Sequence, residues 1–224
     1  SLHDALPIYK VAGVDYRIVP LADYEPDILY QKQVEAYYAD PGLNKPVGRF
    51  GNAADKWGLA NWMAAAVADE ADADVGFYHI GGVRLDSIPA GGVSAAKVYG
   101  LEPFGTLVAR MEMTPAQMRR MIVSKYNDPV NAKEAHRIDL ISTTPYVIVT
   151  DAADNALDVQ FPKLREGRKY KVAVSDYIYR NYKDMEYTGG EITVEKVADI
   201  LLEELRDDSP LKIDNTPRQR VVRK

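Results

Sequence analysis

The sequence predicts an α+β fold, with mixed or antiparallel sheets and packed helices. Between Leu107 and Met113 apolar and polar side chains alternate, which is typical of a half-buried strand. The segment 53–71 is rich in helix formers and holds one glycine and no proline. Four strand patterns joined by polar turns follow one another between 137 and 175. Neighbouring strands with helices between them favour α+β layers over a doubly wound parallel sheet.

The composition narrows the function classes. The 224 residues are 46% hydrophobic and 27% charged, as in an ordinary globular protein. A net charge of −5 argues against a general nucleic-acid binder, which would carry a basic face. The absence of cysteine excludes disulfides, thiolate metal sites and cysteine nucleophiles. No apolar run approaches the ~20 residues of a membrane helix, and no signal peptide is visible in this sequence.

The first eight residues have an unusual composition. They contain Asp4-Ala5-Leu6-Pro7-Ile8, which the end of a common sequencing adapter would encode. We therefore expect residues 1–8 to be non-native, with the natural chain starting upstream; a coincidental pentapeptide is the alternative. Residues 9–46 are expected to form a linker strand and helix, and residues 47–224 the main domain.

In the first half of the chain, the linker helix is expected over 27–38, opening at Pro26, and a loop over 43–52. The helix over 53–71 should pack closely on a sheet through small residues. Its predicted face comprises Trp57, Ala60, Asn61, Ala64, Ala65 and Ala68. The acidic stretch 69–74 is interpreted as its solvated end.

A short strand is predicted at 75–80, followed by a glycine-rich loop that requires positive φ angles. A helical turn over 94–101 and a tight corner at 102–105 precede the alternating strand. Thr114 should cap the next helix, with Pro115 in its first turn and Tyr126 at its end.

The second half is predicted to be β-rich. The four strands are expected at 137–143, 146–151, 156–161 and 169–175, with Asp154-Asn155 in a hairpin turn. Residues 176–190 are expected to be irregular. Thr193 should cap a final helix that Ser209-Pro210 ends, with an apolar stripe formed by Val194, Val197, Ile200, Leu201 and Leu205. The basic tail 218–224 is interpreted as a poorly ordered terminus.

No catalytic motif is visible. His3, His79 and His136 lack the spacing of a metal site, and no carboxylate-rich loop resembles a calcium site. There is no nucleophile elbow and no glycine-rich phosphate loop. The sequence therefore predicts no catalytic residue and no metal site in this chain.

Three residues could belong to a binding site. Arg84 follows a glycine pair, where its guanidinium could approach an anion. Phe104 stands on a Pro-Phe-Gly corner, and Tyr177 follows a strand that should end near Ser175; two such rings can hold a planar base between them. The alternatives are a surface salt bridge for Arg84 and core packing for the two rings.

The order of these parts resembles the C-terminal, substrate-recognition domain of the 5′-nucleotidase / UDP-sugar hydrolase family. "HIGGVR" is similar to that family's N-G-G-G-I-R run, "EPFG" to its P-F-G corner, and "YKVAVSDYIYRNYKDMEY" to a later family segment. "LVARMEMTPAQMRRMI" and, loosely, "KWGLANWMAAAV" also have counterparts. The resemblance covers about residues 47–206 and implies the layered fold of that domain.

The resemblance implies a set of site residues. Phe104 and Tyr177 would stack on the nucleobase, and Arg84 matches the motif arginine. His79 occupies the place of the family's asparagine. Asp184 would stand in for the aspartate of a G-G-D-G loop whose glycines are missing here. The loosest match is Arg49, for another arginine of the family.

The family's chemistry belongs to an N-terminal metallophosphatase domain that holds two divalent metal ions, and its ligand motifs do not occur in this sequence. Two explanations stay open: a gene truncated upstream, or two domains encoded as separate proteins. The helix around 27–39 would be an inter-domain linker or a docking surface. The resemblance also implies a bacterial protein of nucleotide catabolism, in the periplasm or at the cell surface.

We therefore expect the nucleotide- or nucleoside-binding half of a 5′-nucleotidase-like phosphohydrolase, inactive alone, with no cofactor of its own. A non-catalytic scaffold domain that has lost the nucleotide pocket is the first alternative, motivated by His79 and the missing G-G-D-G. An independent hydrolase with an unrecognised site is the second.

Overall fold

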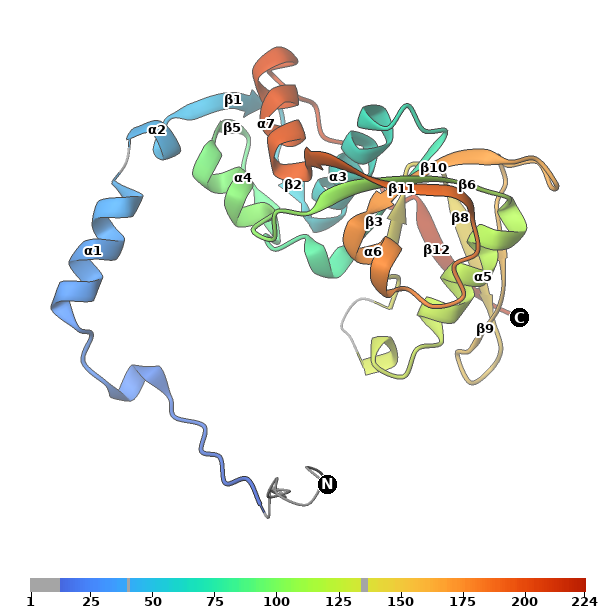
Figure 1. Cartoon of the computed structure of the whole chain (residues 1–224), viewed down its shortest axis with the longest axis horizontal. Helices are drawn as coiled ribbons and strands as arrows, with labels where there is room; N and C mark the ends of the chain where they lie inside the picture. Colours follow the sequence, from blue (N-terminus) through green and yellow to red (C-terminus); the bar gives the residue numbers. More distant parts are fainter. Residues whose placement is uncertain (1–12, 40, 134–136) are drawn as a thin grey trace, which may run out of the picture. The chain divides into compact units, whose positions relative to one another are not determined.

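The computed structural model describes residues 13–39, 41–133 and 137–224 (Figure 1). The expected non-native residues 1–8, with His3, lie outside the described residues, and so does His136. The chain forms two compact units, one up to residue 39 and one from residue 40 onward.

The first unit contains one turn of 3-10 helix, η1 (Leu21–Asp23), and helix α1 (Ile28–Tyr38). The helix predicted from the sequence is therefore confirmed. Its N-cap is Asp27, whose carboxylate accepts hydrogen bonds from the backbone N–H groups of Leu29 and Tyr30. Pro26 lies before this cap, so the expectation that it opens the helix is wrong.

The second unit is built on a five-stranded sheet in the order β11-β6-β10-β3-β7. The strands are β3 (Val75–His79), β6 (Leu107–Met113), β7 (Leu140–Ser142), β10 (Tyr170–Ser175) and β11 (Thr188–Lys196). Strand β10 pairs in parallel with β3, whereas the other neighbours pair antiparallel. This mixed sheet confirms the predicted α+β class.

Helices α3 (Lys56–Glu70) and α7 (Val197–Asp207) lie on one face of this sheet, and α4 (Ala95–Leu101) packs beside α7 in the same hydrophobic core (Figure 1). Helix α3 approaches β3 closely, because a Cβ on Gly76 would lie only 2.1 Å from a backbone oxygen of α3. The predicted close packing is confirmed. Ala64 and Ala68 of the predicted face make this contact, and burial extends beyond that face, with Met63 and Val67 at 0% exposure.

The opposite face packs against helix α5 (Pro115–Tyr126) and a second sheet in the order β12-β8-β9. Its strands are β8 (Tyr146–Thr150), β9 (Ala156–Gln160) and β12 (Gln219–Arg223). Thr114 and Gln117 form a reciprocal capping box at the start of α5, as Thr114-Pro115 predicted. Asp154 has a φ of 65° in the turn between β8 and β9, which confirms the hairpin.

Shorter elements complete the second unit. They are α2 (Pro41–Asn44), β1 (Pro46–Phe50), β2 (Ala54–Asp55), η2 (Ile80–Gly82), β4 (Ser87–Ile88), β5 (Gly91–Ser94), η3 (Asn131–Lys133) and α6 (Asp176–Asn181). Two antiparallel pairs, β1 with β5 and β2 with β4, convert both expected loops into short ribbons. Of the four glycines between 81 and 92, only Gly91 has a positive φ. These segments form strands because each pairs with a segment distant in the sequence, which local composition does not show.

Three predictions near the C-terminus are wrong. Residues 176–190 contain α6 and the start of β11 instead of an irregular segment. Thr193 lies within β11, where its hydroxyl donates to the Val108 carbonyl at 3.1 Å, and Val194 is 84% exposed. The basic tail forms β12, which pairs in parallel with β8.

Within the part of the chain that the structure describes, no helix is long and apolar enough to cross a membrane.

Candidate functional site

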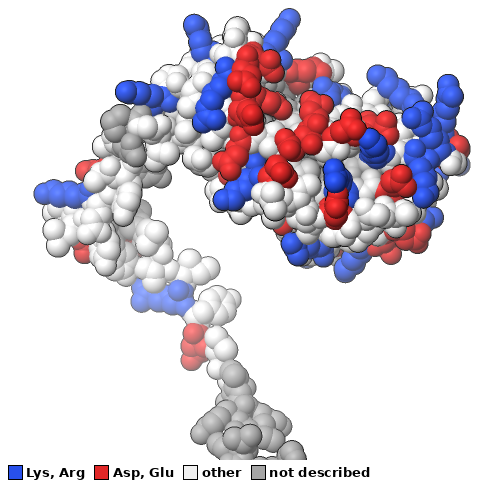
Figure 2. All heavy atoms as spheres, turned by 45° about the horizontal axis from the view of Figure 1, so that its top comes forward, with Lys and Arg blue, Asp and Glu red and all other residues white. Residues whose placement is uncertain are grey.

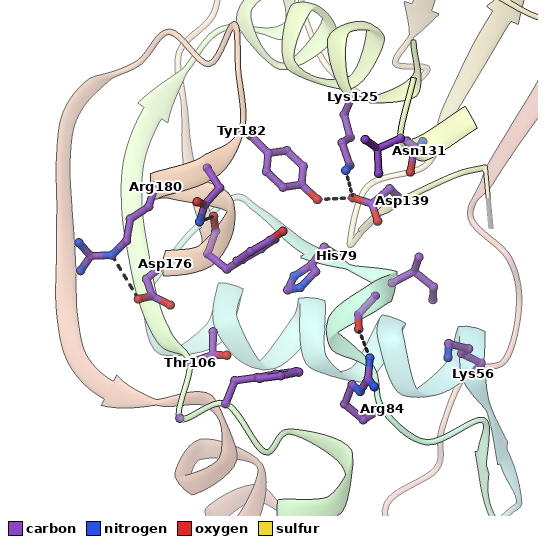
Figure 3. A pocket seen from close by; sticks show the side chains of 17 residues that line it. Lys56, His79, Arg84, Thr106, Lys125, Asn131, Asp139, Asp176, Arg180 and Tyr182 are labelled. Atoms are coloured by element: carbon purple, nitrogen blue, oxygen red, sulfur yellow. Dashed lines mark hydrogen bonds and ion pairs between the residues drawn. The ribbon is translucent and has the colours of Figure 1, made fainter. Parts of the chain in front are cut away.

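One cavity of about 760 Å³ opens at an edge of the five-stranded sheet (Figure 3). Its lining comes from segments far apart in the sequence. These residues are Lys56, His79, Ile80, Gly81, Arg84, Phe104, Gly105, Thr106, Lys125, Val130, Asn131, Asp139, Asp176, Tyr177, Arg180, Asn181 and Tyr182.

The strand order explains why these segments meet. Strands β3 and β10 are parallel neighbours, so the chain leaves both at the same edge, at His79 and Ser175. Strand β6 runs antiparallel to β10 and pairs Val108 with Ser175, so the corner before β6 lies at that edge too. The sheet thus brings η2, the 102–106 corner and α6 to one place.

His79 ends β3 and lies against aromatic neighbours. Its imidazole stacks on the Tyr177 ring, with ring centroids 4.5 Å apart and 26° between the planes. Burial, and then the nearby Lys125 ammonium, lower the pKa of His79 to about 4. The imidazole is therefore neutral at neutral pH.

Tyr177 lies in the first turn of α6, two residues after the Ser175 cap of that helix. Its side chain is 48% exposed and lines the cavity. The Tyr182 ring lies nearly perpendicular to it, with centroids 6.2 Å apart and 81° between the planes. The Tyr177 ring is thus supported on one side by His79 and remains accessible to a ligand.

Phe104 is 61% exposed on the corner before β6. The buried Glu102 carboxylate organises this corner by accepting the backbone N–H groups of Phe104 and Thr106 and the Thr106 hydroxyl, the last at 2.6 Å. Gly105 has a φ of 63°, a conformation that glycine adopts without strain. The exposed ring is therefore held on a rigid corner.

Arg84 follows η2, and its guanidinium carbon lies 5.8 Å from the centroid of the Phe104 ring. Its guanidinium donates one long hydrogen bond, at 3.4 Å, to the Gly81 carbonyl. It forms no ion pair with a carboxylate of the described residues. A cation beside an exposed ring in a cavity suits a ligand with an anionic or polar part next to a planar one.

A second polar group lies on the other side of His79 from Arg84 (Figure 3). The Tyr182 hydroxyl donates to the Asp139 carboxylate, and the Lys125 ammonium lies 3.8 Å from the same oxygen. Burial raises the pKa of Asp139, and burial followed by the Asp139 charge raises the pKa of Tyr182. Sequence reasoning missed these residues, although a carboxylate inside the apolar run 138–141 is a weak sign of a buried, partnered acid.

The cavity is more basic than the rest of the molecule. Its described lining holds four cations, Lys56, Arg84, Lys125 and Arg180, but only two carboxylates, Asp139 and Asp176. The whole chain, by contrast, carries a net charge of −5, and Figure 2 shows acidic side chains gathered on one face of the second unit. Three of these cations form ion pairs: Lys56 with Asp86 outside the lining, Lys125 with Asp139, and Arg180 with Asp176. Arg84 is the lining cation without an ion pair among the described residues, so it is the group that favours an anionic ligand.

The structure brings four of the six sequence-predicted site residues together: His79, Arg84, Phe104 and Tyr177 all line the cavity. The other two are not among its lining residues. The Asp184 carboxylate accepts a hydrogen bond from the Ser124 hydroxyl at 2.6 Å. Arg49 is exposed on β1, where it pairs with Gly92 of β5.

Comparison with known proteins agrees with this architecture. The family model for the 5′-nucleotidase C-terminal domain matches residues 43–188. The 5′-nucleotidase precursor of Thermus thermophilus is 17% identical, with a TM-score of 0.69 over 88% of this chain and 44% of that chain. The NAD nucleotidase of Haemophilus influenzae is 14% identical, with a TM-score of 0.65 over 88% and 42%. The sulfate thiohydrolase SoxB of Thermus thermophilus is 16% identical, with a TM-score of 0.60 over 94% and 42%.

No curated protein matches the chain. The chain spans less than half the length of each of these solved structures. Because the family model matches residues 43–188, well over half of the chain, the protein belongs to the 5′-nucleotidase C-terminal domain family.

Proposed function

We propose that this domain binds a nucleotide or nucleoside for a 5′-nucleotidase-type phosphohydrolase. One observation carries the proposal: two exposed aromatic rings, Phe104 and Tyr177, line the same cavity as Arg84, which lacks a carboxylate partner among the described residues. Membership of the family supports it. The cavity volume lies within the range of about 300–1,000 Å³ typical of small-molecule sites.

Each residue has a distinct role in this proposal. The rings of Phe104 and Tyr177 stack on the base, and Arg84 binds the phosphate or another polar part of the ligand. Stacking of a base on an aromatic ring contributes about 1–3 kcal/mol and tolerates different bases, because every base has a π-face. The guanidinium adds a preference for charged ligands.

We assign no chemical step to this chain. Among the residues that the structure describes, no group of three or more His, Asp or Glu side chains could hold a metal ion. The divalent metal pair that we expect for phosphate ester hydrolysis would lie on a metallophosphatase domain, in the same full-length chain or in a separate protein. The part of the relatives' length that this chain leaves uncovered has room for such a domain.

Calorimetry with adenosine and AMP tests the binding role. The wild type should bind AMP more tightly than adenosine, and Phe104→Ala should weaken both by about 5- to 150-fold, the loss of one stacking partner. Tyr99→Ala is the matched control, because Tyr99 is also an exposed aromatic residue but does not line the cavity. No binding by the wild type at millimolar ligand would overturn the proposal.

Two further measurements separate its parts. Arg84→Ala should reduce the affinity for AMP toward that for adenosine and leave adenosine binding nearly unchanged. Purified protein with added divalent metal should release no phosphate from AMP. Phosphate release that survives repeated purification would place the chemistry in this chain and contradict the assignment to another domain.

A further inference from the structure

Three neighbouring aromatic rings lead from the core of the second unit to the cavity wall. The Tyr78 ring is fully buried and stacks on the His79 imidazole, with centroids 5.3 Å apart and 23° between the planes. The imidazole in turn stacks on Tyr177, with centroids 4.5 Å apart and 26° between the planes. The exposed ring of Tyr177 is thus connected to the core through His79.

The glycine pair after β3 provides room for this imidazole. A Cβ on Gly82 would lie 2.5 Å from His79 Cε1 and 2.7 Å from Nε2, so the imidazole occupies the space that a side chain there would take. A Cβ on Gly81 would approach His79 only to 3.8 Å, an ordinary contact. Gly82 has no positive φ, so the need for glycine is one of space rather than backbone conformation.

Packing alone holds the imidazole in place. Its ring makes no hydrogen bond with any described residue, and Nδ1 is buried without a partner among them. A buried ring nitrogen without a partner costs free energy, and contacts with the neighbouring rings must offset that cost. An amide side chain at position 79 would supply hydrogen-bonding groups but no ring.

We infer that His79 is a positioning residue, which fixes the Tyr177 ring as a platform for the planar ring of the ligand. This inference rests on the proposed function and identifies the group that prepares the Tyr177 ring before binding. Tyr177 is half exposed, and apart from His79 its one described ring neighbour is Tyr182, whose ring lies nearly perpendicular to it. Without the imidazole, the Tyr177 side chain would have to become ordered when the ligand binds. The entropy lost in this ordering weakens the affinity.

Four variants test this inference, with adenosine as the probe. His79→Asn removes the supporting ring, and Gly82→Ala displaces it; each should weaken adenosine binding about 2- to 10-fold, the range that one aromatic pair accounts for. His79→Phe restores a ring and should bind within about 2-fold of the wild type. Gly100→Ala is the matched glycine-to-alanine control and should bind as the wild type does, because Gly100 does not line the cavity and its Cβ would meet nothing within 4 Å.

A second measurement needs no ligand. NOE cross-peaks between the ring protons of Tyr177, assigned by comparison with Tyr177→Leu, and those of Tyr182 should weaken in His79→Asn and Gly82→Ala and stay nearly unchanged in Gly100→Ala. This readout remains valid if Gly82→Ala lowers stability, because His79→Asn must give the same change.

The outcomes separate the inference from the proposed function. If the wild type binds adenosine but His79→Asn leaves both its affinity and the cross-peaks between Tyr177 and Tyr182 unchanged, His79 does not position the ring and the inference is wrong. If the wild type does not bind, the proposed function fails and the ligand platform with it. The NMR comparison then still decides whether His79 fixes Tyr177.

Discussion

The buried imidazole of His79 should make the stability of this domain depend on pH. In the folded protein, burial and then Lys125 lower its pKa to about 4 from the ordinary value of 6.5. Between these two values the unfolded chain binds a proton at this position and the folded protein does not. The free energy of unfolding should therefore fall as the pH is lowered through this window and rise again toward neutral pH.

The two pKa values set the size of the effect. The full shift corresponds to about 3 kcal/mol, reached only below pH 4. At pH 5 the free energy of unfolding should be about 2 kcal/mol lower than at pH 8, because the imidazole is almost fully protonated in the unfolded chain and mostly neutral in the folded protein. Asp139 acts in the opposite sense: its pKa is raised by burial, so acidification below that value favours the folded state.

Urea unfolding followed by circular dichroism at pH 8 and pH 5 measures this effect. His79→Phe is the comparison variant, because it keeps a ring and removes the titrating group. The other titratable groups, Asp139 among them, are present in both proteins, so the difference between their pH dependences isolates the titration at position 79. If His79→Phe lost as much stability as the wild type between pH 8 and pH 5, the neutral buried imidazole would be refuted.

Three further predictions concern packing and capping, and urea unfolding at pH 7 measures each. Thr114→Ala should destabilise by about 1 kcal/mol, because it removes the cap of α5; an unchanged midpoint would count against the capping box. Gly76→Ala should destabilise by about 3 kcal/mol, because its Cβ would meet a backbone oxygen of α3. Gly100→Ala in α4 meets nothing and should stabilise by about 0.5–1 kcal/mol. Equal effects of the two substitutions would contradict the close packing of α3. Trp62→Phe should cost about 1–3 kcal/mol, because it leaves the Glu204 carboxylate without its indole N–H partner, and a neutral result would show that water replaces that bond.

Local rules were sufficient where one short segment carries its own signal. The cap of α5 needs only Thr114 and Pro115, and the alternation from Leu107 to Met113 defines β6 without reference to its partners. The same rules failed for Thr193. A threonine before an apolar helical pattern is a good cap by sequence, but pairing of β11 with β6 holds it in a strand, and α7 begins only at Val197.

Local sequence also predicts only part of the site. Arg84 and Phe104 could be predicted because glycine-containing turns precede or follow them, which is a property of neighbouring residues. Lys125 and Tyr182 carry no such signal, and Asp139 carries only the weak one of its apolar neighbours, because these residues meet only when α5, β7 and α6 pack together.

The sequence by itself determined the secondary-structure types of the well-capped and strictly alternating segments and the chemical groups available for binding. Propensities, caps and side-chain periodicity are local, so one chain is enough to read them. Only the tertiary structure decided which groups share the cavity, because the parallel pairing of β10 with β3 brings their ends to one edge of the sheet. It also shows why position 82 is glycine, since the space that a Cβ there would take is filled by the His79 imidazole, which stacks on Tyr177 of a distant helix.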